Sequence, residues 1–72
     1  MTSLMNLRTA RRIARLTQAQ LAAKAGVEQA TISMLENGLI RRPSYELVSR
    51  LADALNVSPA ELFPIEPIEA KA

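Results

Sequence analysis

The stretch from residue 18 to residue 37, QAQLAAKAGVEQATISMLEN, limits what this chain can fold into more than any other feature. Two helices that cross at a steep angle need a small residue where they approach and a residue that tolerates positive φ in the tight turn between them. Ala22 and Gly26 stand at these two positions. Apolar side chains at the spacing that a helix-turn-helix requires would pack between the two helices and fix their angle. They are Leu21, Ala25, Val27, Ile32 and Leu35. The stretch therefore predicts a helix-turn-helix.

Capping residues indicate where these two helices begin and end. Thr17 and Gln20 have the spacing of a capping box, which predicts that the first of the two helices starts directly after Thr17 and stops at the turn glycine. We expect the second helix to begin near Glu28 or Gln29 and to end at Gly38.

The residues before this stretch predict one more helix. Leu7, Ala10 and Ala14 fall on one face at helical spacing, so we expect a helix from about Leu4 to Ala14.

Two further helices are predicted after the stretch. Ser44 is a good N-cap for a fourth helix, which Asn56 would end in the left-handed conformation. The inward face of this helix would be Leu47, Val48, Leu51, Ala52 and Leu55. Ser58-Pro59-Ala60-Glu61 combines a capping box with proline at the first helical position, which predicts a short fifth helix ending near Phe63.

Proline dominates the last part of the chain. Pro64 and Pro67 make residues 64–72 a poor candidate for regular structure, and we expect a flexible tail there. Residues 1–63 are expected to form one all-α domain, a compact bundle of five helices in which the second and third form the helix-turn-helix.

Several classes of function are disfavoured by composition. The 72 residues include no Cys and no His, so thiolate nucleophiles, imidazole bases and the two best zinc ligands are missing. There is no glycine-rich phosphate loop and no pair of acids placed to separate their pKa values. We therefore expect no enzyme, no cofactor, no metal and no small-molecule ligand. A membrane span and a secretory leader are not expected either, and the chain reads as cytoplasmic.

Charge is distributed unevenly along the chain. Residues 1–45 carry seven basic and two acidic side chains, a net +5, whereas residues 46–72 carry two basic and five acidic ones, a net −3. One positive face on a small domain indicates a polyanionic partner, although a solvated surface with uneven charge would show the same pattern.

At this point the chain resembles a known family. The pattern LTQAQLAAKAG…TISMLENG…RRPS…LADALNVSPAEL is similar to the helix-turn-helix domain of lambdoid phage repressors, Cro proteins and related (Xre-like) bacterial regulators. The resemblance covers residues 7–63 and implies a lambda-repressor-like fold. It also implies a sequence-specific regulator, most simply a repressor, that places a recognition helix at about residues 28–37 in the major groove of double-stranded DNA. Such a protein would be encoded by a bacterium or phage and would be associated with the nucleoid when bound.

The resemblance also implies roles for individual residues. The DNA phosphates would be contacted by Gln18, Thr31, Asn37, Arg41 and Arg42. The bases would be read by Gln29, Ala30, Ser33, Met34 and, through a cytosine N4, Glu28. Plainer interpretations stay open: Gln18 as part of a cap, the two arginines as solvated loop charge, and Met34 as an exposed side chain with no partner.

Four positions concern the structure of the domain as well as its contacts. Arg11 and Glu36 match a family pair that forms a salt bridge, although Arg11 could also face phosphate. Two residues depart from the family pattern. Glu28 stands where members often have Ser or Thr, and Arg15 stands where many have Gly.

Specificity for a long site calls for a homodimer on a pseudo-palindromic operator. Val57, Leu62, Phe63 and Ile65 could form its apolar patch, or they could complete the core. A protein-binding or antitoxin-type module, and a domain cut from a longer repressor, remain as alternatives.

Overall fold

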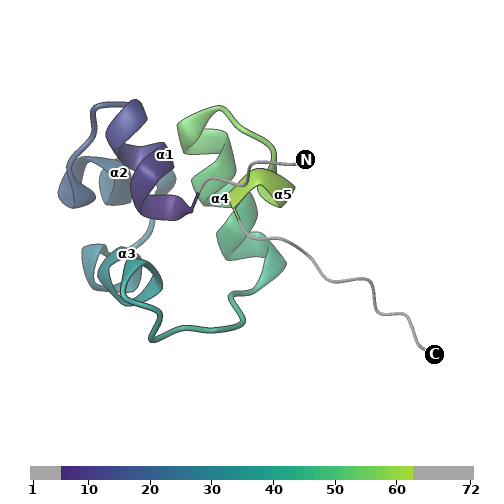
Figure 1. The fold of residues 1–72 in the computed structure, drawn as a ribbon. Helices are drawn as coiled ribbons and strands as arrows, with labels where there is room; N and C mark the ends of the chain where they lie inside the picture. Colours follow the sequence, from purple (N-terminus) through teal and green to yellow (C-terminus); the bar gives the residue numbers. More distant parts are fainter. Residues whose placement is uncertain (1–5, 63–72) are drawn as a thin grey trace.

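The computed structural model describes residues 6–62, and within this range the chain folds into helices and connecting loops without a strand (Figure 1). The helices are α1 (Leu7–Ile13), α2 (Gln18–Ala25), α3 (Gln29–Glu36), α4 (Tyr45–Leu55) and α5 (Pro59–Leu62). This arrangement confirms the predicted all-α class. Within the described range, none of the helices has the length and apolar character needed to cross a membrane.

Local side-chain chemistry sets most of the helix ends. Thr17 Oγ1 accepts from the Gln20 N–H at 3.0 Å, and Gln20 Oε1 accepts from the Thr17 N–H at 2.9 Å, so the capping box of α2 is complete. Ser44 Oγ accepts from the Leu47 N–H at 3.1 Å at the start of α4. Asn56 ends α4 with a φ of 61°, as its tolerance of the left-handed region predicts.

The first helix is shorter than the sequence predicts. Asn6 has an extended backbone, with ψ at 169°, and its side chain accepts from the Thr9 N–H at 2.8 Å. It is therefore the N-cap, and α1 begins at Leu7 rather than near Leu4. The helix ends at Ile13, and Ala14 is an exposed cap residue instead of part of the inward face.

The third and fifth helices also differ from expectation at their ends. The α3 helix ends at Glu36, two positions before the predicted Gly38, and Asn37 is its C-cap. The capping box of α5 is half formed: Glu61 accepts from the Ser58 N–H at 3.2 Å, while the Glu61 N–H donates to the Ser58 main-chain oxygen at 3.0 Å. The predicted end near Phe63 and the predicted tail at 64–72 lie outside the described residues.

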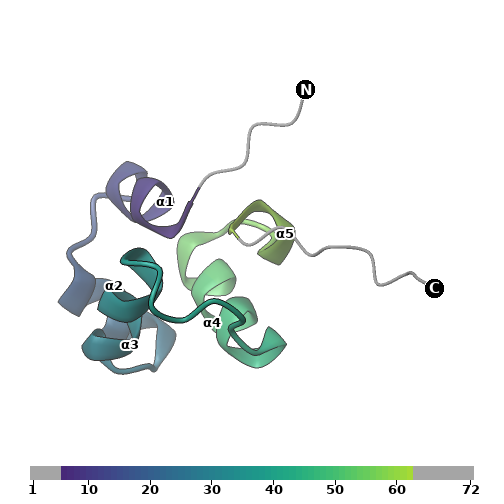
Figure 2. The ribbon, with the colours of Figure 1, turned by 60° about the horizontal axis from the view of Figure 1, so that its bottom comes forward.

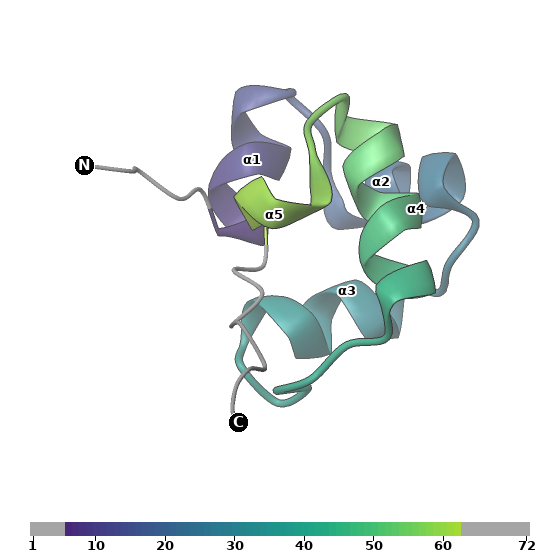
Figure 3. The same ribbon diagram turned by 90° about the vertical axis from the view of Figure 1, so that its right-hand side faces the viewer.

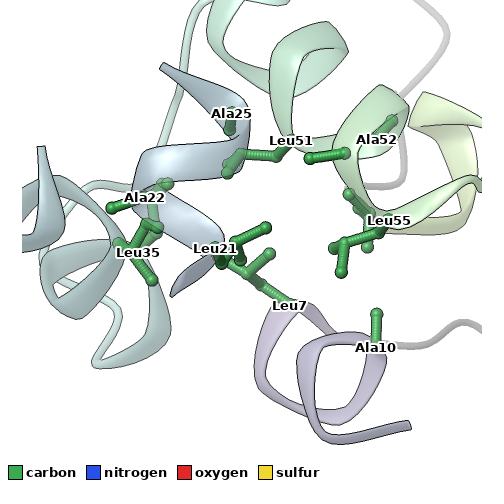
Figure 4. Packing of buried hydrophobic residues seen from close by; sticks show 12 residues of the cluster. Leu7, Ala10, Leu21, Ala22, Ala25, Leu35, Leu51, Ala52 and Leu55 are labelled. Atoms are coloured by element: carbon green, nitrogen blue, oxygen red, sulfur yellow. The ribbon is translucent and has the colours of Figure 1, made fainter. Parts of the chain in front are cut away.

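One apolar core joins all five helices. Its fully buried centre is formed by Leu21, Ile32 and Leu51, one each from α2, α3 and α4. Figure 4 shows side chains from α1, α2, α3 and α4 converging on this core. Ala54 is buried although the pattern did not place it inward, while Leu47, predicted to be inward, is only half-buried. Alanines at several core positions allow the helices to approach closely.

The packing places α3 at the edge of the molecule. The α2 helix contacts both α3 and α4, whereas α3 has its other close helical neighbour in α1. Figures 2 and 3 show α3 away from α5, with the loop from residue 37 to residue 44 crossing to the start of α4. One side of α3 is therefore uncovered.

Candidate functional site

The outward side of α3 carries most of the side chains predicted to read bases. Gln29, Ala30 and Met34 are exposed, and Ser33 is half-buried. The opposite side of the helix is fixed in the core by Ile32 and Leu35. Packing of the buried side therefore decides which polar side of α3 faces outward.

The start of α3 is weakly capped. Glu28 occupies the N-cap position with an extended backbone, but its side chain forms no cap hydrogen bond and is exposed. Thr31, the third residue of the helix, is half-buried. The carboxylate of Glu28 gains from the helix dipole, and it is also free to meet an outside donor.

Residues predicted to contact phosphate come from α2 and from the segment that follows α3. Gln18 is half-buried at the first position of α2, and Asn37 is exposed directly after α3. Arg41 and Arg42 are exposed in the segment that leads to α4. The structure brings Gln18 and Asn37 to the same end of α3, where Glu36 lies between them in the network of contacts described next.

A buried carboxylate organises this end of the site. The Glu36 side chain has 0% exposure, and its Oε2 accepts from Arg11 Nε at 2.6 Å. Its Oε1 accepts from Arg11 Nη2 at 3.1 Å, from Gln18 Nε2 at 3.1 Å and from Arg8 Nε at 3.2 Å. Groups from α1 and α2 therefore meet on one carboxylate of α3.

The charges of this cluster stabilise each other. Burial by itself raises the pKa of Glu36, but the hydrogen bonds from Arg11, Gln18 and Arg8 and the charge of Arg11 outweigh it, and the pKa falls from 4.5 to about 2. The hydrogen bond to Glu36 raises the pKa of Arg11. Glu36 is therefore ionised at neutral pH. Removing either Arg11 or Glu36 would leave the charge of the other without a counter-ion in a position largely shielded from water.

Arg11 uses most of its donors inside the protein. Besides its two bonds to Glu36, its Nη1 donates to the Leu16 main-chain oxygen at 2.8 Å, and its side chain is only 12% exposed. This geometry favours the salt-bridge role of Arg11 over contact with phosphate.

Arg8 is a member of the site that the sequence analysis did not include. It contacts Glu36 through Nε, and its Nη2 donates to Asn37 Oδ1 at 3.2 Å. A sequence signal exists: Arg8 lies three positions before Arg11, so the two share a face of α1. The sequence did not reveal that this face meets the end of α3.

Two of the four apolar residues proposed for a dimer patch are described by the structure, and both pack on the core. Leu62 is buried and Val57 is half-buried against the core, which is the core-completing alternative. Phe63 and Ile65 lie outside the described residues. The large exposed apolar side chains of residues 6–62 are instead Ile13, Met34, Leu39 and Tyr45.

Comparison with known proteins connects this geometry to a family. A helix-turn-helix family model matches residues 7–62, which include all five helices. Two proteins from strains of Mycobacterium tuberculosis, each named as an uncharacterized HTH-type transcriptional regulator, are 39% identical to this chain over 57 residues. The aligned region is 79% of this chain and 40% of each relative, so the chain spans about two fifths of the length of these relatives. These matches confirm the resemblance found in the sequence, and the relatives are named as regulators rather than as enzymes.

Proposed function

Because the chain belongs to the helix-turn-helix family, we propose that it binds double-stranded DNA and regulates transcription, with α3 as the recognition helix. The observation that carries the proposal is the uncovered polar side of α3, bordered by exposed arginines and held at a fixed angle by a buried ion pair. An α-helix fits the major groove, where each base pair offers its own pattern of donors and acceptors.

Direct reading of bases would come from the outward side of α3. Gln29 can pair with N6 and N7 of adenine through its amide, while Ala30 and Met34 offer apolar contact to thymine methyl groups. Ser33 can donate or accept, and the exposed Glu28 can accept from a cytosine N4. The exposure of all of these side chains except the half-buried Ser33 supports the assignment.

Phosphate contacts would hold the helix in register. Gln18 Nε2 donates one of its hydrogens to Glu36, and its second hydrogen is available for a hydrogen bond to a phosphate oxygen. Asn37 and the half-buried Thr31 offer neutral donors, and Arg41 and Arg42 add charge near the end of α3.

We further infer a repressor that binds as a homodimer to a pseudo-palindromic operator. One α3 of 8 residues reads only a few base pairs, so useful specificity requires two half-sites about one helical turn apart. A bound repressor of this kind would block transcription by occupying its operator, and it would reside with the nucleoid in the cytoplasm.

Selection of bound duplexes from a random pool, with the mass of the complex measured alongside, tests the proposal. We expect enrichment of a two-fold symmetric sequence and a complex containing two protein chains. Failure to enrich any sequence at low salt would refute sequence-specific DNA binding and favour a protein-binding module, which the exposed carboxylate of Glu28 at the start of α3 would suit.

Two substitutions separate base reading from phosphate contact. Gln29→Ala should cost about 1–3 kcal/mol on the selected site and relax the choice at one base pair. Arg41→Ala, or the same change at Arg42, should weaken all sequences alike and reduce the slope of log K against log salt by about one. Arg50→Ala is the matched control, because Arg50 bonds Glu46 on α4 and should leave the slope closer to that of the unmodified protein. Equal losses on specific and random DNA for Gln29→Ala would refute its reading role.

A further inference from the structure

The side-chain amide of Asn37 is fixed in one orientation by two neighbours. Arg8 Nη2 donates to Asn37 Oδ1 at 3.2 Å. Because arginine has donors and no acceptor, the atom of Asn37 that faces it is the carbonyl oxygen. On the other side, Asn37 Nδ2 donates to Ser33 Oγ at 3.4 Å. The two contacts agree, and within residues 6–62 they leave the second Nδ2 hydrogen available to a partner outside the protein.

The guanidinium of Arg8 is suited to hold this orientation. Its Nε donates to Glu36 Oε1 at 3.2 Å while its Nη2 reaches Asn37, so one planar group spans two acceptors. Glu36 is in turn buried and bonded twice by Arg11. The amide of an exposed residue is thus connected, through Arg8, to the buried carboxylate that anchors α1 to α3.

We propose that Arg8 is a positioning residue for DNA binding, which turns the N–H of Asn37, and not its carbonyl oxygen, toward the phosphate. The inference rests on the proposed function. A free carboxamide can present either end, and the end that carries oxygen has nothing to donate to a phosphate oxygen. Arg8 removes that alternative before DNA arrives, so Asn37 meets the phosphate in the productive orientation.

Arg8 acts here through Asn37 and not as a simple positive charge. Lysine at this position keeps the charge and can still bond Glu36. It has a single nitrogen, however, and cannot reproduce the planar fork that engages two acceptors. The substitution Arg8→Lys therefore separates positioning from charge.

A double-mutant cycle on duplex binding tests the proposal. The selected duplex is titrated with Arg8→Lys, with Asn37→Ala and with the double variant. We expect Arg8→Lys to weaken binding by about 3- to 10-fold, the effect of losing one well-oriented hydrogen bond. The salt slope should not change, because the charge is retained. In the Asn37→Ala background, Arg8→Lys should change the affinity by less than about 2-fold.

Arg12→Lys is the matched control, because Arg12 is an exposed arginine on the same helix. It should change the affinity by less than about 2-fold. The side-chain amide resonances of Asn37, recorded without DNA, give a second readout that should move in Arg8→Lys and stay in place in Arg12→Lys. Circular dichroism confirms that each variant is folded.

Each result decides something different. Unchanged affinity in Arg8→Lys, or the same loss with and without Asn37, would overturn the positioning role while leaving DNA binding intact. Unmoved amide resonances would overturn the orientation itself. Failure of the unmodified protein to bind any duplex at low salt would overturn the proposed function, and the positioning role with it.

Discussion

Replacing Glu36 by glutamine tests the central electrostatic feature of the domain. The substitution Glu36→Gln keeps the shape of the side chain and removes its charge, so Arg11, 12% exposed, loses its counter-ion. The pKa of Glu36 lies at about 2 instead of its ordinary 4.5. A difference of about 2.5, at about 1.4 kcal/mol per pH unit, sets a ceiling of about 3 kcal/mol on what the charge contributes near neutral pH.

Solvent reduces this value in part, since the second cation, Arg8, is 41% exposed. The loss of the Arg11 counter-ion is already contained in this value, because the pKa shift compares the charged and the neutral carboxyl beside the same Arg11. We therefore expect Glu36→Gln to lower the free energy of unfolding by about 2–3 kcal/mol near pH 7.

The pH dependence gives the sharper test. Because the pKa is lowered in the folded state, the stabilisation by Glu36 is fully present above the unfolded value of 4.5 and is lost as pH falls toward about 2. The variant has no carboxylate to titrate at this position. The difference in stability between the two proteins should therefore be constant above about pH 5.5 and should shrink steadily below it.

Urea unfolding followed by the helical circular dichroism signal suits this chain, which has one Tyr and no Trp. Glu46→Gln is the matched control: Glu46 and Arg50 form an exposed pair at 3.1 Å, with side chains 76% and 50% exposed, so its loss should cost about 0–1 kcal/mol. Equal effects of the two substitutions at neutral pH would refute the reasoning. So would a difference for Glu36→Gln that persists unchanged at about pH 2.

Backbone conformation leads to two further expectations. Arg15 has a φ of 63°, so Arg15→Gly should raise the free energy of unfolding by about 0.5–1 kcal/mol. Asn56→Gly, at a φ of 61°, should gain less stability because asparagine tolerates this region. A loss of stability in Arg15→Gly would contradict the argument. Gly26→Ala should cost about 1–2 kcal/mol in thermal or urea unfolding, because φ is +72° and the new Cβ would lie 3.3 Å from Arg50 Nη1. Gly38→Ala, at a φ of +78° with nothing within 4 Å, isolates the backbone cost, and an equal or larger loss there would show that the contact at Gly26 adds nothing.

The parts of the fold that depend on neighbouring residues were predictable from the sequence. The capping box of Thr17 and Gln20 and the left-handed cap at Asn56 are chemical relations within a few residues of each other. Helical periodicity also placed Leu21 and Leu51 in the core, where both are fully buried.

The predictions that failed concern the ends of helices and the edge of the core. Ala14 fits the apolar face of α1 by spacing alone, but Arg15 turns the chain there and leaves Ala14 exposed. Asn6 caps α1 because its side chain accepts from the Thr9 N–H. Helical periodicity carries no information about which residue caps the helix.

The candidate site was predictable from the sequence only for features that depend on a single helix. Exposure of Gln29 on α3 follows from burial of Ile32 and Leu35 at helical spacing. The contacts of Arg8 with Glu36 and Asn37 join residues 28 and 29 positions apart. They depend on how α1 packs beside α3, which no local pattern encodes.

The two sides of α3 separate the residues proposed to read DNA from the residues that hold the fold. Ile32, Leu35 and Glu36 hold the helix, while Gln29 and Ala30 face outward and have no share in the core. Exchange of outward residues would therefore cost little stability, since surface substitutions usually stay within about 0.5 kcal/mol. The outward side chains, which are the ones proposed to read DNA, can in this way be exchanged by a few mutations while the domain stays folded.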